Sequence, residues 1–265
     1  MVKRYLFLIY AASVLLYSCR NDEEEHKEKG LISQEAQLKK SISEYPDSLL
    51  LTENLIEYYR NNGSYDTAIH VTNLAIQKDS GNVELWDIMG TLQYENGDTL
   101  KAIKAYEVAI NIYPLPEYII SLGTLYAQTK NPRALVMADA LVFADRSKAK
   151  REALFIKGLY HTYINDKKNA LIFFDSCINT DYTYMFAYRE KAIILYEQKK
   201  YEDALKVLTR AVTIQNSFDE GYYWMGKCYE RLDSVQKAKE NYQMALLYDK
   251  NFIEAKEALT RLEVK

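Results

Sequence analysis

A regular spacing between alanines constrains the fold of this chain more than any other feature. Ala68, Ala102, Ala170, Ala204 and Ala238 are separated by 34, 68, 34 and 34 residues. Most of them are followed four positions later by a large residue and seven positions later by a small one, as at Tyr106, Phe174, Leu208 and Tyr242, and at Ala75, Ala109, Cys177, Ala211 and Ala245. A fixed period of this length predicts a repeat architecture, in which each unit buries its apolar face against the next.

Small residues also recur in a first segment of each repeat, upstream of these alanines. Gly90, Gly158, Ala192 and Gly226 each lie twelve residues before the repeated alanine, and a large residue precedes each by four, namely Trp86, Leu154, Tyr188 and Tyr222. Because an α-helix advances about 100° per residue, these positions share one helical face. Glycine and proline are scarce, at 9 and 4 of 265 residues, which disfavours turn-rich β structure. The pattern predicts an all-α chain of closely packed antiparallel helix pairs.

The pattern resembles the tetratricopeptide repeat, a 34-residue unit with the skeleton Trp-x2-Leu-Gly-x2-Tyr followed by Ala-x3-Phe, Ala and Pro. Segment 83–116 matches it best, through Trp86, Met89, Gly90, Tyr94 (one place late), Ala102, Tyr106, Ala109 and Pro114. The resemblance implies a right-handed α-solenoid of about six helix-turn-helix repeats within residues 31–265. The repeats would span 49–82, 83–116, 117–150, 151–184, 185–218 and 219–252, with capping helices at 31–45 and 252–264.

Three finer expectations concern turns and ends. Gly63, Gly97 and Asn165 occupy the same repeat position between helices, where a left-handed residue commonly ends a helix. In the third repeat Ala134 comes two residues early and follows Pro132, so we expect a shortened turn there. In the last helix we expect Ile253 and Leu259 to face inward.

The first residues have the pattern of a secretion signal. Lys3 and Arg4 precede an apolar run over 5–16, which is too short to span a bilayer comfortably. The ending Leu16-Tyr17-Ser18-Cys19 resembles the lipobox of bacterial lipoproteins, in which the signal is cut before a cysteine that is then diacylated. The resemblance implies a signal peptide over 1–18, lipid attachment at Cys19 and a place in the bacterial cell envelope as an outer-membrane lipoprotein, periplasmic or surface-exposed. An uncleaved anchor and a plain signal peptide are the alternatives.

Residues 19–30 follow as a polar and charged segment without an apolar face, which predicts a flexible tether. The acidic cluster just after Cys19 resembles the surface-export signal of lipoproteins from Bacteroides-type Gram-negative bacteria. A solvated spacer is the alternative. Membrane contact would then come only through the lipid anchor.

A candidate partner site follows from helix geometry. Positions 2, 5, 9 and 12 of each first helix form a stripe about 130° from the packing face. In the fourth to sixth repeats this stripe and its edge carry residues that packing does not require, namely Phe155, Leu159, Tyr163, Phe186, Arg189, Ile193, Tyr196, Tyr223 and Lys227. An apolar, aromatic patch with nearby cations is typical of a partner-binding surface. Burial between neighbouring first helices is the alternative. The Lys and Asn pair of the co-chaperone carboxylate clamp is absent from positions 5 and 9.

Catalytic chemistry has no signature in this chain. It has no phosphate loop, dinucleotide fingerprint, His-Glu-x-x-His or Cys-x-x-Cys, and we expect neither metal nor cofactor. A net charge of −3 and a pI near 5.8 disfavour nucleic acid. We expect a non-catalytic scaffold that binds a protein partner in the concave groove. The alternatives are an accessory to surface uptake or secretion that binds through its convex face, and a glycan- or small-ligand-binding protein.

Two kinds of side chain could carry a covalent modification: serines and threonines in Asp-Ser/Thr triplets, and two cysteines. Asp-Ser/Thr-apolar triplets at Ser48, Thr67, Thr99 and Ser234 resemble O-glycosylation sites of Bacteroides-type secreted proteins, although the same residues suit helix caps. Cys177 and Cys228 are expected to be small buried hydrophobes, with a disulfide as the alternative.

Overall fold

The computed structural model describes residues 33–144 and 149–263. Within these ranges the chain forms fourteen α-helices and no strand, so the prediction of an all-α fold is confirmed. None of these helices combines the length and the apolar character needed to cross a bilayer. Cys19, the signal peptide over 1–18 and the tether over 19–30 lie outside the described residues.

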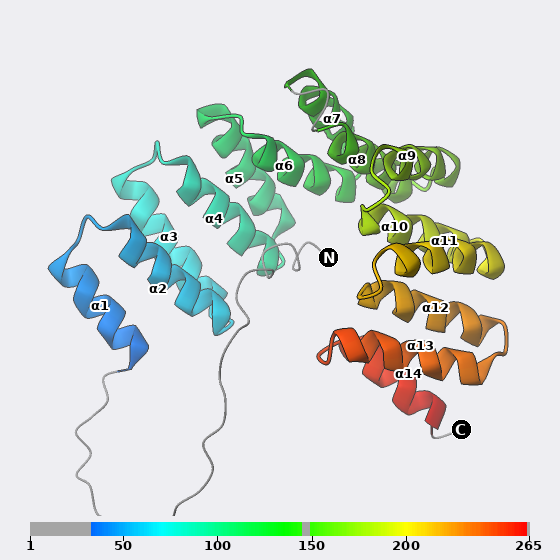
Figure 1. Cartoon of the computed structure of the whole chain (residues 1–265). Coiled ribbons are helices and arrows are strands. Elements are labelled where there is room, and N and C mark those ends of the chain that lie inside the picture. The colour runs from blue at the N-terminus through cyan, green and yellow to red at the C-terminus, as the bar shows by residue number, and fades with distance from the viewer. Residues whose placement is uncertain (1–32, 145–148, 264–265) are drawn as a thin grey trace, which may run out of the picture. The chain divides into compact units, whose positions relative to one another are not determined.

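The chain divides into two compact units, Met1–Ile112 and Tyr113–Lys265. The helices of the first unit are α1 (Gln34–Glu44), α2 (Leu49–Asn61), α3 (Tyr65–Lys78), α4 (Val83–Glu95) and α5 (Thr99–Ile112). Those of the second unit are α6 (Pro116–Gln128), α7 (Arg133–Ala144), α8 (Lys150–Tyr163), α9 (Lys167–Thr180), α10 (Met185–Glu197), α11 (Tyr201–Ile214), α12 (Asp219–Arg231), α13 (Val235–Tyr248) and α14 (Ile253–Glu263). Figure 1 shows these helices in chain order.

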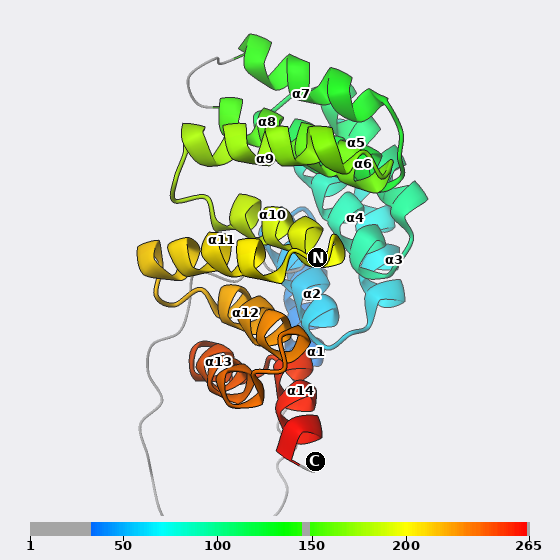
Figure 2. The same cartoon turned by 90° about the vertical axis from the view of Figure 1, so that its right-hand side faces the viewer.

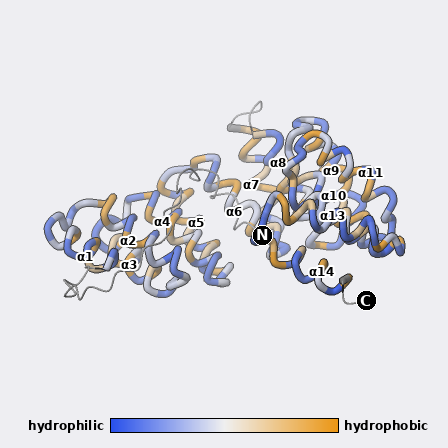
Figure 3. Tube along the Cα trace, turned by 60° about the horizontal axis from the view of Figure 1, so that its bottom comes forward, coloured by the Kyte–Doolittle hydropathy of each residue, from blue (hydrophilic) through white to orange (hydrophobic). Residues whose placement is uncertain are grey.

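Each helix packs on the next one along the chain within its unit, as Figures 1 and 2 show. In the second unit the first helices of successive pairs also touch, so that α8 contacts α6 and α10, and α10 contacts α12. Hydrophobic residues alternate with hydrophilic ones along the helices, which can be followed in Figure 3. This alternation gives each helix a buried and an exposed side.

Glycines in the first helices make room for rings from the second helices. A Cβ atom added to Gly158 would lie 2.5 Å from a ring atom of Phe174, and one added to Gly226 would lie 2.6 Å from the ring of Tyr242. Both rings are fully buried. The spacing of small and large residues in the sequence therefore reflects direct contact between the two helices of a pair.

The six turns within the helix pairs share one hydrogen-bonded form. A residue with positive φ stands in each of them: Gly63, Gly97, Lys130, Asn165, Lys199 and Asp233. The next residue donates its N–H back to the carbonyl five residues earlier, as from Ser64 to Tyr59 at 2.8 Å and from Lys200 to Leu195 at 2.9 Å. This is the Schellman arrangement, which satisfies carbonyls at the helix end. The left-handed prediction for Gly63, Gly97 and Asn165 is confirmed.

The shortened turn of the third repeat has a specific cause. After Lys130, the N–H of Ala134 donates to the carbonyl of Asn131 at 3.0 Å, three residues back, whereas the N–H of Ala68 reaches Ser64, four residues back. A tighter first turn therefore brings Ala134 into the packing position one residue sooner, and its side chain is fully buried.

The expected inward face of the last helix is wrong at one position. Ile253 is 64% exposed, whereas Phe252, Ala255 and Leu262 are buried. Phe252 immediately precedes α14 and fills the inward position itself, which turns its neighbour Ile253 toward solvent. Leu259 packs partly buried against this core, as expected.

Candidate functional site

Three residues of the predicted stripe do not lie on an open surface. Phe155 and Leu159 on α8 and Arg189 on α10 are all buried, so the expectation that packing leaves them free is wrong. The Phe155 ring lies 5.7 Å from that of Phe174 and 5.2 Å, edge-on, from that of Tyr184. These three residues are therefore buried by packing, and Arg189 is buried in contact with the neighbouring first helix, which was the alternative for the stripe.

Arg189 links two first helices through an ion-pair network. Its guanidinium donates to Glu220 on α12 at 2.6 Å and to Glu190 at 2.8 Å. Burial alone would lower the pKa of Arg189, but the two carboxylates outweigh this effect and raise it. The guanidinium is therefore a charged packing group, held by two acids and also lying 5.1 Å above the Phe186 ring.

Six stripe residues remain partly exposed: Tyr163, Phe186, Ile193, Tyr196, Tyr223 and Lys227. The structure brings Tyr196, Tyr223 and Lys227 together. Phe186 instead packs beside Tyr184, at a ring distance of 5.5 Å. The partner-binding role of the six residues stays a prediction.

We call Tyr196, Tyr223, Trp224 and Lys227 the Lys227 cluster. The ammonium of Lys227 lies 4.3 Å from the ring centroid of Trp224, 5.3 Å from that of Tyr196 and 5.6 Å from that of Tyr223. Tyr196 and Trp224 also contact each other edge to face at 5.5 Å, joining α10 to α12. Rings so placed attract a cation through their quadrupoles.

No carboxylate among the described residues pairs with Lys227. Among the described residues its ammonium forms no hydrogen bond or ion pair, although it carries three donors. The nearby Glu230 accepts instead from the hydroxyl of Tyr242 and from Arg261, the latter at 2.7 Å. Burial lowers the pKa of Lys227, and Glu230 opposes that effect only in part. The cluster is a partly buried cation among aromatic rings with its donors unused.

Trp224 is the member of the cluster that sequence reasoning missed. It stands one position beyond Tyr223 and so falls off the predicted stripe. Its residue type could have drawn attention to it, because tryptophan is enriched at the energetic centres of interfaces.

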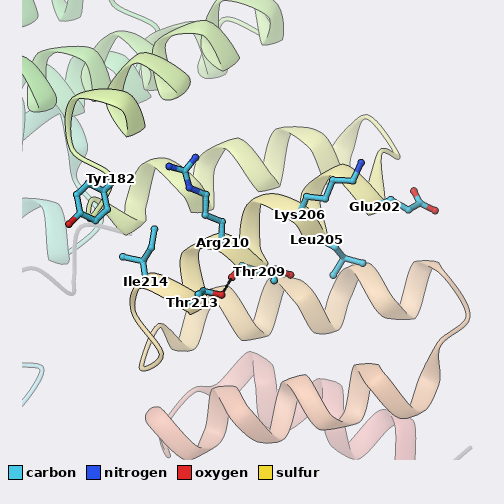
Figure 4. Close-up of a pocket in the computed structure, with 8 residues that line it drawn as sticks. All are labelled: Tyr182, Glu202, Leu205, Lys206, Thr209, Arg210, Thr213 and Ile214. Carbon is cyan, nitrogen blue, oxygen red and sulfur yellow. Dashed lines mark hydrogen bonds between the residues drawn. The ribbon is translucent and has the colours of Figure 1, made fainter.

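A hollow of the second unit lies elsewhere. It measures about 730 Å³ and is lined by exposed and half-buried residues of α11 together with Tyr182 (Figure 4). No residue of the predicted stripe takes part, and Lys206 at its edge is already paired with Asp203 at 2.9 Å. We place the candidate site at the Lys227 cluster because an unpaired cation among rings selects a ligand chemically, whereas one exposed helix side does not.

The four candidate glycosylation residues differ in how their hydroxyls are used. Ser48 accepts from the N–H of Leu51 at 3.4 Å as the cap of α2, and Ser234 donates to the carbonyl of Leu232 at 3.3 Å. Thr67 is exposed and Thr99 is partly buried, and neither hydroxyl has a hydrogen bond among the described residues. Modification at any of them stays a prediction.

The two cysteines outside the signal region are buried free thiols. Burial raises the pKa of Cys177 and of Cys228 to about 12, which keeps both protonated and unreactive. The prediction of buried small hydrophobes is confirmed for both, and no disulfide joins them. In the part of the chain that the structure describes, no group of three His, Cys, Asp or Glu residues is placed to hold a metal ion.

Family models for the TPR repeat match residues 193–233, and models for the tetratricopeptide repeat match residues 86–115 and 220–251. These matches show tetratricopeptide repeats within residues 86–115 and 193–251, which lie in three of the six predicted repeats. Human tetratricopeptide repeat protein 33 is 24% identical over 124 residues, which cover 44% of this chain and 47% of that protein. The chain spans less than half the length of the curated relatives it matches.

Solved structures share the fold. A tetratricopeptide repeat protein from Parabacteroides merdae superposes with a TM-score of 0.71 at 20% identity, over 87% of this chain and 91% of that one. The type IV pilus biogenesis factor PilW superposes with a TM-score of 0.57 at 17% identity, over 79% and 97%. Identities this low show a common fold and nothing about function. Tetratricopeptide repeat proteins are typically non-catalytic and mediate protein–protein interactions.

Proposed function

We propose that the chain is a non-catalytic adaptor of a bacterial envelope, anchored by a lipid on Cys19, that binds a protein partner along α10 and α12. The observation that carries the proposal is the Lys227 cluster, in which a partly buried ammonium lies among three rings and pairs with no carboxylate of the described residues. A surface of this kind is incomplete until an anion docks on it, because a desolvated cation gains most from a charged partner.

The chemistry of the cluster defines the partner. An acidic side chain would accept from the Lys227 ammonium, and an apolar neighbour would cover the rings of Tyr196 and Trp224. Tyr223 extends the same apolar surface toward Phe252, at a ring distance of 4.9 Å. The expected partner segment is therefore a peptide or helix with an acidic residue flanked by apolar ones.

Replacing Lys227 by methionine should weaken binding of such a peptide about 10- to 100-fold. The change keeps a long apolar stem over the rings but removes a charge-assisted hydrogen bond, which contributes about 1.5–3 kcal/mol. Binding is measured by fluorescence anisotropy with labelled acidic–apolar peptides, and Trp224 emission gives a second readout.

The matched control is Lys206→Met, a similar change on an exposed lysine of α11 that should leave affinity unchanged. Binding by the wild type should also weaken as the pH rises through the pKa of Lys227, which lies below its ordinary value of 10.5, because the ammonium then loses its charge. Equal affinity of the wild type and Lys227→Met for every peptide that binds would exclude the cluster as the site.

The anchor is tested separately by Cys19→Ser. The unchanged chain should sediment with membranes and carry an intact mass that lacks residues 1–18 and includes acyl chains. The variant should lose the acyl mass and leave the membrane fraction almost completely, since stable anchoring depends on the attached chains. A wild-type protein of unprocessed mass, or a serine variant that stays on membranes, would contradict the lipoprotein assignment.

A further inference from the structure

A second hollow lies in the first unit, between α1 and α2. It measures about 380 Å³, which falls in the range of small-molecule sites. Its polar lining consists of Gln34 from α1 together with Asn54, Glu57, Tyr58, Asn61 and Asn62 from α2 and its following turn. Leu38 of α1 completes the lining, and five of the seven lining residues are exposed, so this is an open hollow in which side-chain amides outnumber apolar groups.

The amides in this hollow have unused hydrogen-bonding capacity. Gln34, Asn54 and Asn61 form no side-chain hydrogen bond with the described residues. By contrast, Asn62 donates to the carbonyl of Tyr58 at 2.9 Å, and Asn96 elsewhere in the unit donates to Asp66 at 3.1 Å. Each unused amide offers both donors and an acceptor to a ligand.

Glu57 narrows the choice of ligand. Its carboxylate, which only accepts hydrogen bonds, has no ion pair among the described residues. The nearby Arg60, whose pKa the hydrogen bonds and charge of Glu95 and the charge of Glu57 raise, is paired with Glu95 at 2.6 Å and 2.7 Å. The hollow thus carries one negative charge, which repels phosphates and other anions. It calls for a neutral ligand rich in hydroxyl donors.

The ring of Tyr58 supplies an aromatic surface to the hollow. It is partly buried and held edge-on against Tyr59 at 5.6 Å. An amphipathic ring of this kind can cover the C–H face of a sugar while the amides and the carboxylate bind its hydroxyls. An extended peptide fits less well, because its carbonyl oxygens would face the Glu57 carboxylate.

We infer that the α1–α2 hollow binds a neutral saccharide of one or two rings. The inference does not rest on the proposed partner site, since it concerns other residues in the other unit. It assigns ligand binding to residues of the first unit, none of which belongs to the aromatic stripe.

The test uses the full chain and saturation-transfer NMR with methyl glycosides of glucose, mannose, galactose and N-acetylglucosamine. At least one sugar should give a signal, and the double variant Asn54→Ala/Asn61→Ala should weaken its binding at least tenfold. The matched control Asn179→Ala/Asn216→Ala removes two exposed asparagines of the second unit and should bind like the wild type. Circular dichroism checks that each variant is folded.

Three results would overturn the inference. One is the absence of a signal from all four sugars with folded wild-type protein. Another is equal binding by the wild type and Asn54→Ala/Asn61→Ala. A stronger signal from lysine methyl ester than from any sugar would assign the hollow to a cation recognised by Glu57. None of these results bears on peptide binding at the Lys227 cluster.

Discussion

Replacing Phe174 by alanine should destabilise the second unit by about 3–5 kcal/mol, the usual cost of deleting a fully buried aromatic ring. Phe174 has no exposed surface and its ring lies against Gly158. The measurement is urea unfolding of the full chain carrying Trp86→Phe. Trp224 is then the single tryptophan and reports on the second unit alone.

Ile172→Ala provides the comparison on the same helix. Ile172 is 51% exposed, so its truncation should cost less than about 1 kcal/mol. If the two variants lost similar free energies of unfolding, the contact between Gly158 and the Phe174 ring would not be what stabilises the pair. The pairing of glycine with an aromatic residue would then lose its explanation.

Arg189→Met should also lower the free energy of unfolding of the second unit by about 3–5 kcal/mol. The change leaves the buried Glu190 and the half-buried Glu220 without their cation. The same Trp224 unfolding experiment measures it. Arg210→Met on α11 serves as the control, since Arg210 is exposed and forms no ion pair among the described residues.

A triple variant separates charge from packing. Arg189→Met/Glu190→Gln/Glu220→Gln removes the stranded charges and should recover much of the lost stability, because neutral amides cost less to bury than carboxylates. If Arg189→Met instead kept full stability and lost only peptide binding, Arg189 would be a partner contact, as its place on the stripe first suggested.

The fold could be predicted from the sequence to the extent that local rules determine it. The contacts of Gly158 with Phe174 and of Gly226 with Tyr242 follow from spacing alone, because only a helix pair brings such positions together. The left-handed turns were predictable where glycine or asparagine stands. At Lys130 and Lys199 the same conformation occurs in residues that do not favour it, whereas Asp233 is of a type that tolerates it.

The candidate site was less predictable, because its residues depend on contacts between repeats. Helical geometry placed Tyr196, Tyr223 and Lys227 on one face, and the structure groups them. Helical geometry could not show that Arg189 pairs with Glu220 as well as with its neighbour Glu190, since the pair with Glu220 depends on how closely α10 approaches α12. The amides of the α1–α2 hollow carry no sequence signal beyond their residue type, because Gln34 comes from a different helix.

The Schellman turns also bear on how the chain acquires its structure. Each turn closes a helix pair with bonds between residues at most five positions apart, and each helix packs on its neighbour in sequence. A helix pair therefore loses little loop-closure entropy when it forms its buried contacts. Low contact order of this kind favours rapid folding. Order can begin at any pair and spread to the next. Because α1 contributes no buried residue, the helix that borders the α1–α2 hollow gains the least from this packing.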